Sequence, residues 1–355
     1  MTITVLSVAY PLAAVSPDAT GGAEQVLSHR DNALVKTGHR SIVVAREGSR
    51  VAGDLIATPA VAGALDAMAI ATVQARYRAV IAAALERESI DVVHMHGVDF
   101  HAYLPADPVP VLATLHLPLD WYPADIFHPR RPATWLNCVS AAQQASCPAA
   151  SCLLAPIENG IPVDLLAMRR VNRKFALVLA RICPEKGIHL AIAAAKRARA
   201  PLLIAGDICL YADHQRYFDH ELKPRLDRRR RYIGPVGFAR KCRLLGSARC
   251  LIVSSLVPET SSLAAKEALA AGTPVVAFGK GALPDVIEHG RTGFLVSNET
   301  EMAEAILAAD TIDPAACRTA AEKRFRLEPK IANYFAAYEM LARTKRHGQR
   351  VEAAA

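Results

Sequence analysis

The sequence predicts an α/β protein with two Rossmann-like domains, each built on a doubly wound parallel sheet. Short apolar runs of strand length alternate with alanine-rich stretches whose apolar residues recur at helical spacing, which is typical of strand–helix–strand units. The chain has 355 residues, 52% of them hydrophobic, which is enough for two domains that each bury a core. The series of strands restarts at Phe175, after the charged stretch 168–174, so we place the domain boundary there.

The first domain is expected to span residues 1–168. Its apolar runs are almost uninterrupted, as in parallel strands that are buried on both faces. Helical spacing covers residues 23–37 and 68–87 between these runs. The expected strands are Ile3–Val8, Ser41–Ala45, Val92–His94 and Val111–Leu115.

The second domain is expected to span residues 169–328. A last segment, 329–355, follows it and begins with an amphipathic helix over residues 329–345. The helices expected in the second domain cover 186–198, 238–247 and 261–271. Its expected strands are Phe175–Ala180, Pro201–Ala205, Cys250–Val253 and Pro274–Phe278.

The helix expected over residues 261–271 has clear start and stop signals. Thr260, Ser261 and Ser262 are residue types that cap helix N-termini, and Gly272 followed by Pro274 is a good stop. We expect the helix to open near Thr260 or Ser261, at the end of a strand. Such a start directs unpaired N–H groups and a partial positive charge at whatever binds there, so the sequence predicts an anion site.

Two carboxylates flank this helix start. Glu259 stands just before it, and Glu267 lies about two turns inside the helix. Because carboxylates accept hydrogen bonds from hydroxyls, the arrangement suits a phosphate flanked by two hydroxyl-bearing groups, such as a nucleotide sugar. By themselves the two glutamates would also fit a plain surface helix, since glutamate is a good helix former.

Charge is unevenly distributed along the chain. Residues 1–165 carry 10 Lys+Arg and 15 Asp+Glu, a net charge of −5, whereas the remaining residues carry 32 and 19, a net charge of +13. A basic second domain favours an anionic ligand such as a pyrophosphate. Part of this charge is the run Arg228–Arg231, which we interpret as a solvated surface. No nucleic-acid-binding motif accompanies it, so nucleic acid is not an expected partner.

The composition limits the location and the chemistry. No apolar run reaches the ~18–20 residues of a membrane helix, and the N-terminus has no secretion-signal pattern. The eight cysteines include no Cys-x-x-Cys pair and indicate buried thiols of a cytoplasmic protein. Sequence motifs of serine hydrolases, P-loop proteins, zinc peptidases and Asp-x-Asp metal-dependent transferases are absent.

Several residues near the expected strand ends of the first domain could line a site. The pair Gly21-Gly22 permits positive φ and a close approach of the backbone to a ligand. His116 and His96 each follow a strand; His96 and His94, spaced i and i+2, could also bind a metal ion, although no third ligand is evident.

Aromatic residues gather in the same domain. Trp121, Tyr122 and Trp135 lie within one short segment. Aromatic faces suit sugars or flat acceptors, and a place in the core is the alternative.

Five separate stretches resemble one known family. The stretches 259–277 and 281–296 are similar to the donor half of family-four retaining glycosyltransferases, and 179–187 resembles their Arg-x4-Lys-Gly segment. The stretch 21–24 resembles their first-strand loop, and 159–164 resembles the segment before their second domain. This resemblance implies the GT-B fold, in which two Rossmann-like domains face each other across a cleft and the C-terminal helix crosses back to the first domain.

The resemblance also implies roles for individual residues. Arg181 and Lys186 would neutralise the departing nucleoside diphosphate without a metal ion, Glu259 would contact the transferred sugar, and His116 would lie beside that sugar; these four are the predicted catalytic residues. Glu267 would hold the ribose. The predicted donor-binding residues are Glu267, Leu263, Ala264, Val236, Ser262 and Gly22. The predicted acceptor-binding residues are Gly21, His96, Trp121 and Tyr122.

These features predict a retaining, metal-independent glycosyltransferase without a cofactor. It would move a sugar from a nucleoside diphosphate sugar, with a UDP-sugar favoured over a GDP-sugar, to a small soluble acceptor. The acidic first domain favours a neutral or cationic acceptor, and the stretches 10–15 and 217–225 resemble a bacterial subgroup that includes pterin glucosyltransferases. A glycosyl phosphorylase or nucleotide-sugar epimerase on the same fold is an alternative, and so is a nucleotide-binding protein without activity.

Overall fold

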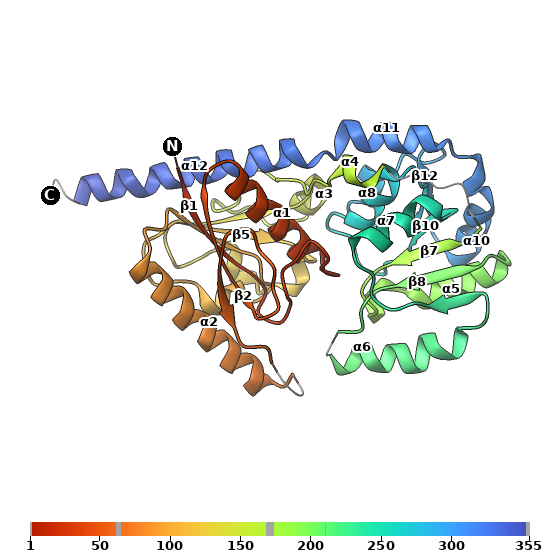
Figure 1. The fold of residues 1–355 in the computed structure, drawn as a ribbon, viewed down its shortest axis with the longest axis horizontal. Coiled ribbons are helices and arrows are strands. Elements are labelled where there is room, and N and C mark those ends of the chain that lie inside the picture. Colours follow the sequence, from red (N-terminus) through yellow and green to blue (C-terminus); the bar gives the residue numbers. More distant parts are fainter. Residues whose placement is uncertain (1, 62–64, 168–173, 210, 353–355) are drawn as a thin grey trace. The chain divides into compact units, whose positions relative to one another are not determined.

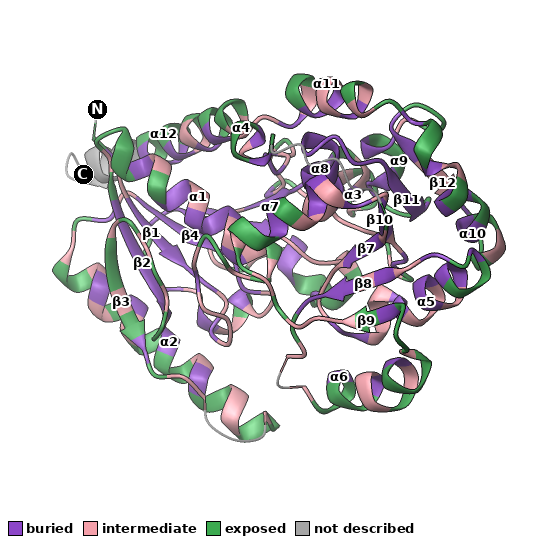
Figure 2. Ribbon diagram, turned by 45° about the vertical axis from the view of Figure 1, so that its right-hand side comes forward, coloured by how far each residue is buried: buried purple, intermediate pink, exposed green. Residues whose placement is uncertain are grey.

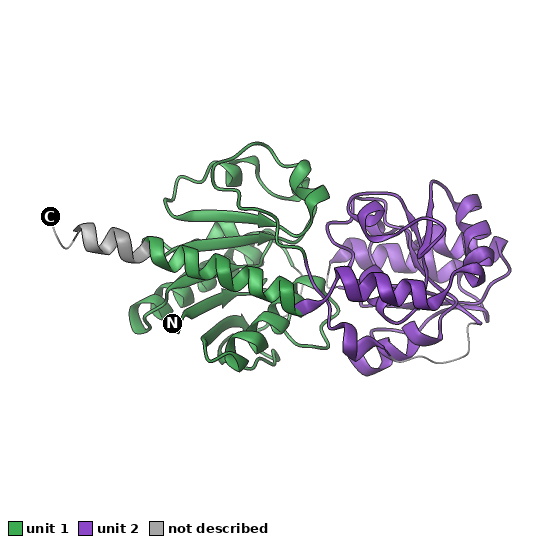
Figure 3. Cartoon of the chain, turned by 90° about the horizontal axis from the view of Figure 1, so that it is seen from above, with its two compact units in different colours: residues 1–158, 328–355 green, residues 159–327 purple. Residues whose placement is uncertain are grey.

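The computed structural model describes residues 2–61, 65–167, 174–209 and 211–352, and it confirms the predicted fold class. The chain forms two compact units (Figure 3), one of residues 1–158 with 328–355 and one of residues 159–327. The boundary expected between residues 168 and 169 lies outside the described residues.

The first unit contains a parallel sheet with the strand order β3-β2-β1-β4-β5-β6. This is the doubly wound Rossmann order, in which the direction of winding reverses between β1 and β4. Ligands of such sheets bind beyond the carboxyl ends of the strands near this reversal. The strands are β1 Thr4–Val8, β2 Arg40–Arg46, β3 Asp54–Thr58, β4 Val92–Met95, β5 Val111–Leu115 and β6 Thr134–Cys138.

The C-terminal helix α12, Leu327–Glu352, packs on the first unit, as the sequence predicts (Figure 1). Its side chains Tyr334, Tyr338 and Leu341 are buried in one apolar cluster with Ile3 and Val5 from the start of the chain. The other helices of this unit are α1 Gly22–Lys36, α2 Ala67–Arg87 and α3 Ala141–Ala145, with short 3-10 turns at Phe100–Tyr103, Leu119–Trp121 and Ala124–Phe127.

The second unit contains a parallel sheet with the order β12-β11-β10-β7-β8-β9, which reverses between β10 and β7. The strands are mostly buried, and the helices around them expose their outer faces (Figure 2). The strands are β7 Ala176–Leu179, β8 Leu202–Ala205, β9 Arg230–Tyr232, β10 Cys250–Val253, β11 Val275–Phe278 and β12 Gly293–Val296. The helices are α4 Val163–Leu166, α5 Ile188–Arg197, α6 Ala212–Tyr217, α7 Phe238–Ser247, α8 Leu263–Ala270, α9 Leu283–Val286, α10 Glu299–Ala308 and α11 Pro314–Arg324.

Part of the basic run Arg228–Arg231 is not a solvated surface. Arg230 belongs to strand β9, is buried, and pairs with the carboxylate of Asp227. The charge of this buried arginine is therefore compensated by a carboxylate at the edge of the sheet.

Helix α8 begins at Leu263, later than the expected start near Thr260 or Ser261. The backbone of Glu259 forms a parallel bridge with Gly281, so the chain is still extended there. The N-cap residue is Ser262, whose side chain makes no capping hydrogen bond because the residue lies in the left-handed region, with φ 50° and ψ 66°. The expected capping by a hydroxyl side chain is therefore wrong at this position.

The described helices include none whose length and apolar character would allow it to span a bilayer.

Candidate functional site

The loop between β7 and α5 carries Arg181 and Lys186. It ends at Gly187, which has φ 55° and whose added Cβ would come within 2.4 Å of the Ser254 carbonyl oxygen, so a larger residue fits neither the backbone conformation nor the space. The Ser254 hydroxyl donates a 2.9 Å hydrogen bond to the Lys186 carbonyl oxygen. Because Ser254 directly follows β10, these contacts hold the two loops together at the carboxyl ends of adjacent strands.

Lys186 and Glu259 form an ion pair in this corner, with 2.5 Å between Nζ and Oε1 and side chains that are 23% and 10% exposed. Burial raises the pKa of Glu259, but the charge of Lys186 and hydrogen bonds from Lys186 and Ser255, with the charge of Arg181, outweigh this effect and leave the pKa below its ordinary value. The Glu259 carboxylate is thus ionised at neutral pH and can accept hydrogen bonds.

The backbone on the other side of Glu259 is held by Gly281. This glycine has φ 62°, and an added Cβ would come within 2.3 Å of the Glu259 carbonyl oxygen. The same oxygen accepts a 2.7 Å hydrogen bond from the Ala282 N–H group. The Glu259 main chain is therefore fixed independently of the ion pair.

The start of α8 offers two N–H groups. The N–H groups of Ala265 and Lys266 both donate to the Ser262 carbonyl oxygen, at 3.1 and 3.2 Å. The N–H groups of Leu263 and Ala264 precede them and have no acceptor within the helix. The left-handed conformation of Ser262 is rare for a side chain other than glycine and is typical of functional sites. Together these features suit an anion at the helix start.

Glu267, which the sequence predicts as a ribose contact, is buried and paired with Lys241. The distance from Lys241 Nζ to Glu267 Oε1 is 2.5 Å, and the side chains are 11% and 6% exposed. Lys241 belongs to none of the motifs of the sequence. A signal for it exists, because Lys241 occupies the same helical stripe as the buried Cys242 and Leu245 of α7.

Lys266 has a structural role in the second unit. Its Nζ donates hydrogen bonds to the Asn159 carbonyl oxygen at 2.9 Å and to the Ser261 hydroxyl at 3.1 Å, and it lies 5.2 Å from the centre of the Phe325 ring. Asn159 is the first residue of the second unit, and Phe325 is close to its end. The buried ammonium therefore fastens both ends of the unit to α8.

Several predicted donor residues of the second unit lie together. Arg181, Lys186 and Glu259 lie with the start of α8 near the ends of β7 and β10, and Arg181 is close enough for its charge to lower the pKa of Glu259. Val236 is half-buried in the loop between β9 and α7.

Gly21 and Gly22 form the start of α1 in the first unit. Neither has positive φ, so the pair does not use the conformational freedom that glycine permits. Gly21 has φ −79°, and a Cβ there would come within 1.8 Å of a carboxylate oxygen of Glu24. The Glu24 side chain thus folds back over the helix start and occupies this space.

The three strand-end histidines of the first unit surround a buried arginine. Arg30 of α1 lies 2.9 Å from His94 Nδ1 and 2.8 Å from His96 Nδ1, and its guanidinium stacks over the Tyr334 ring at 4.3 Å. His96 Nδ1 is in turn 3.1 Å from His116 Nε2. A guanidinium at this position would repel a metal ion, so the alternative of a metal pair at His94 and His96 is not supported.

Both ring nitrogens of His94 have hydrogen-bonding neighbours. Nε2 lies 2.7 Å from the Thr114 hydroxyl oxygen and 3.1 Å from Arg30 Nη1, and the Thr114 hydroxyl in turn donates to Asn137 Oδ1 at 2.7 Å. Nδ1 lies 2.6 Å from the Tyr338 hydroxyl oxygen and 2.9 Å from Arg30 Nη1. These contacts fix the imidazole ring in the core of the first unit.

These histidines are neutral over most of the pH range. Burial, supported by the charge of Arg30, lowers the pKa of His116 to about 3. Burial and Arg30 also hold the pKa values of His94 and His96 well below the ordinary value. The sequence analysis missed Arg30, although it lies one helical turn from the buried Val26 on α1.

The two predicted aromatic acceptor residues differ in exposure. Trp121 is 36% exposed, whereas Tyr122 is 6% exposed and packs near Phe100 in the core. The Tyr122 hydroxyl accepts a 3.3 Å hydrogen bond from the Leu117 N–H group. Trp121 thus retains surface for a ligand, and Tyr122 retains little.

Two family models match successive parts of the chain. Residues 20–159 match the model described as Glycosyltransferase Family 4, and residues 173–309 match the model described as Glycosyl transferases group 1. The first match ends at Asn159, one residue beyond the stretch 1–158 of the first unit, and the second match lies within the second unit.

Individual proteins are similar over part or all of the chain. Alpha-maltose-1-phosphate synthase of Mycolicibacterium smegmatis is 31% identical over 164 residues, which cover 43% of this chain and 42% of that protein. The structure of AviGT4, a glycosyltransferase involved in avilamycin A biosynthesis, has a TM-score of 0.71 and 25% identity over 96% of this chain and 98% of that chain. HepE of Anabaena, in complex with UDP-glucose, has a TM-score of 0.72 and 19% identity over 94% of this chain and 100% of that chain.

The two model matches agree with the two six-stranded parallel sheets and with the likeness to AviGT4 over nearly the whole chain. The chain belongs to the family-four glycosyltransferases of the GT-B fold.

Proposed function

We propose that this chain transfers a sugar from a nucleoside diphosphate sugar, preferably a UDP-sugar, to a small acceptor with retention of configuration and without a metal ion. The observation that carries this proposal is the ionised Glu259, paired with Lys186 beside Arg181 and the start of α8. The HepE structure, of the same fold and in complex with UDP-glucose, supports the choice of donor.

The diphosphate would be held by positive charge from the protein. Arg181 and Lys186 lie on one loop, and the N–H groups of Leu263 and Ala264 point out of α8. A guanidinium, an ammonium and a helix start can together stabilise the charge that develops on a departing phosphate. In this proposal a phosphate oxygen of the leaving group takes the proton of the acceptor hydroxyl, which attacks on the same face.

The two glutamates would hold the two ends of the donor. The Glu259 carboxylate accepts hydrogen bonds from hydroxyls of the transferred sugar, and Glu267 accepts them from the ribose while Lys241 compensates its charge. Val236 would meet the base through its backbone, and Ser262 would face the phosphates.

The acceptor would bind on the first unit. Neutral His116 and His96 can donate or accept a hydrogen bond without changing charge, and the exposed face of Trp121 suits a flat or sugar-like group. Gly21 and Tyr122 complete the predicted acceptor set, whereas Gly22 belongs to the predicted donor set and His116 would lie beside the transferred sugar. The acidic balance of this part of the sequence favours a small neutral or cationic acceptor over an anionic lipid.

A cytoplasmic location is part of the proposal. All eight cysteines are free thiols, and six of them are buried. Free thiols of this number suit a reducing compartment.

The proposal is tested by calorimetry and product analysis. We expect UDP to bind in EDTA more tightly than GDP, and UDP-glucose or UDP-N-acetylglucosamine to yield a product with retained configuration. Arg181→Ala and Lys186→Ala should each lower turnover by roughly 30- to 1,000-fold, from ~2–4 kcal/mol of lost stabilisation. Arg197→Ala, which removes an exposed charge at the end of α5, is the matched control and should leave turnover within twofold, roughly.

Three outcomes would overturn the proposal. One is a strict requirement for a metal ion in donor binding. Another is release of a sugar phosphate only when free phosphate is added, which would identify a phosphorylase. The third is interconversion of the donor sugar without an acceptor, which would identify an epimerase.

A further inference from the structure

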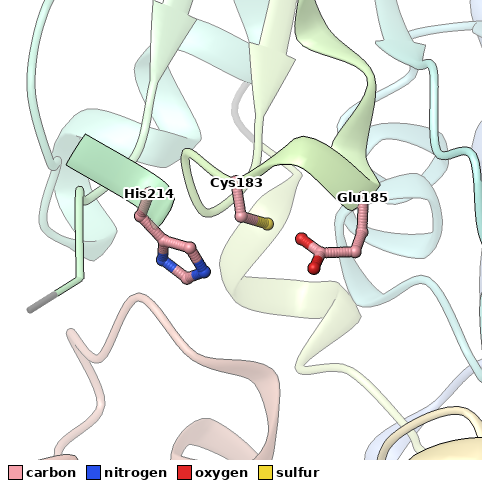
Figure 4. Close-up of side chains that lie close together, drawn as sticks. All are labelled: Cys183, Glu185 and His214. Atoms are coloured by element: carbon pink, nitrogen blue, oxygen red, sulfur yellow. The ribbon is translucent and has the colours of Figure 1, made fainter. Parts of the chain in front are cut away.

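A second cluster of reactive side chains lies in the second unit. Cys183 and Glu185 come from the loop between β7 and α5, and His214 comes from helix α6. One ligand atom from each residue lies within 4.8 Å of the other two, and the three side chains point toward one another (Figure 4). This is the one such cluster of three or more among the residues that the structure describes.

The cluster is incompletely hydrogen-bonded. Glu185 Oε2 and His214 Nδ1 are buried and have no hydrogen-bond partner. The Cys183 side chain is 1% exposed, and His214 is 9% exposed. The Cys183 thiol is hydrogen-bonded to the Glu185 side chain, and its Sγ also lies 3.7 Å from the Arg181 carbonyl oxygen, which is a weak contact. Because buried polar atoms normally have hydrogen-bond partners, the unpaired atoms of this cluster indicate that it binds a further ligand.

We propose that these three residues bind a thiophilic divalent cation of the Zn²⁺ type. The Cys183 thiolate, one Glu185 carboxylate oxygen and a neutral His214 ring nitrogen would be the protein ligands, and a water molecule would complete a tetrahedral site. Sulfur, nitrogen and oxygen ligands in one site are typical of zinc. Magnesium and calcium prefer oxygen ligands only, so they are not the expected ions.

The charges of such a site balance. Binding releases the thiol proton to solvent, which leaves one negative charge on Cys183 and one on Glu185. The divalent cation cancels both, and neutral His214 adds no charge. The complex therefore has no net charge, and the nearby Arg181 guanidinium does not oppose it.

The geometry also indicates what the ion would do. Cys183 and Glu185 belong to the loop that presents Arg181 and Lys186, whereas His214 belongs to a helix that follows β8. An ion shared by both elements would fix this loop against α6. The site is inferred from its own residues, so it does not depend on the proposed transfer reaction.

Cobalt provides a direct test. The full-length protein, freed of metal with a chelator and dialysed, is titrated with Co²⁺, whose absorption reports both tetrahedral geometry and a thiolate ligand. We expect one equivalent to bind with a thiolate-to-cobalt charge-transfer band, and Zn²⁺ but not excess Mg²⁺ to displace it. Cys183→Ser should abolish the band, and Glu185→Gln and His214→Ala should each weaken cobalt binding by about tenfold or more.

Cys147→Ser is the matched control, because Cys147 Sγ lies 3.3 Å from Cys138 Sγ and this pair is the other candidate thiol site. We expect this variant to bind Co²⁺ as the wild type does. Zn²⁺ should also raise the melting temperature of the wild type and of Cys147→Ser, but not that of Cys183→Ser.

A charge-transfer band that survives in Cys183→Ser, or that disappears in Cys147→Ser, would overturn the proposal. So would cobalt binding without thiolate absorption. Far-ultraviolet circular dichroism of each variant shows that it is folded; if Cys183→Ser does not fold, loss of affinity in the more conservative Glu185→Gln decides the question.

Discussion

Replacing Glu259 by glutamine tests whether its charge serves the transferred sugar or the fold. The change keeps the size of the side chain and removes the negative charge 2.5 Å from Lys186 Nζ. If Glu259 contacts the sugar, turnover should fall roughly 10- to 150-fold, because one charged hydrogen bond contributes ~1.5–3 kcal/mol. UDP carries no sugar beyond its ribose, so its binding should not be weakened.

The ion pair makes the expected effect on UDP more specific. In the free protein Glu259 compensates Lys186, so a diphosphate must compete with this carboxylate for the ammonium. Removing the charge should therefore strengthen UDP binding by on the order of 1 kcal/mol, roughly fivefold. Because the two side chains are 23% and 10% exposed, the loss of the pair should also lower the free energy of unfolding by ~1–3 kcal/mol.

Calorimetry with UDP, steady-state transfer and denaturant unfolding give the three quantities. Glu288→Gln is the control, since Glu288 pairs with Arg291 at 2.6 Å on the surface of the same unit and is 35% exposed. It should change stability by less than about 1 kcal/mol and leave both UDP binding and turnover unchanged. A Glu259→Gln protein that binds UDP much more weakly, with unaltered turnover of bound donor, would refute the reasoning.

Two further predictions follow from the buried charges. Lys241→Met leaves the Glu267 carboxylate buried without its partner, so it should lower the free energy of unfolding by ~3–5 kcal/mol. Adding Glu267→Gln to this variant should restore most of the stability but not the affinity for UDP. A Lys241→Met protein as stable as the wild type would contradict this prediction. The second prediction concerns the three histidines. The pKa of His116 is lowered to about 3, and the pKa values of His94 and His96 are also lowered. Below pH ~6.5, the ordinary pKa of histidine, the unfolded chain therefore binds more protons than the folded protein. The stability that these histidines contribute should be fully present above pH ~6.5. Below that pH, the free energy of unfolding should fall by up to ~1.4 kcal/mol per histidine for each pH unit, down to pH 3. An unfolding midpoint that stays constant between pH 7.5 and 5 would count against this prediction.

The sequence predicts the inner strands of both sheets but not their edges. The eight expected strands correspond to the inner positions, and the four that were not expected, β3, β6, β9 and β12, are the outermost strands of the two sheets. An inner parallel strand is buried on both faces and against two neighbours, so its sequence is continuously apolar. An edge strand has one neighbour, and β3 shows the consequence in its largely exposed residues.

The candidate site is predictable in its residue types but not in its pairs. Spacing and resemblance predict Glu259, Glu267 and Lys186 as site residues. In the structure Lys186 pairs with Glu259, which is 73 residues away in the sequence. Glu267 pairs with Lys241, which is 26 residues away in the sequence and belongs to no motif. Such partners meet only after the sheet has formed, so local spacing cannot identify them. What the sequence does contain is a lysine in an apolar helical stripe, which requires a buried partner.

Two lysines of this unit face carboxylates: the partly buried Lys186 pairs with Glu259, and the buried Lys241 pairs with Glu267. The buried Lys266 donates to the Asn159 carbonyl oxygen and to the Ser261 hydroxyl, contacts that join α8 to the start of the unit. Buried ion pairs are often no more stabilising than apolar residues of the same size, so stability alone does not explain two of them. An ion pair does keep a carboxylate ionised in a low-dielectric corner, and an ammonium that holds Glu259 can turn to a phosphate when a donor binds. The two pairs therefore support the proposed donor site, in which the carboxylates would accept from hydroxyls and Lys186 would meet the diphosphate.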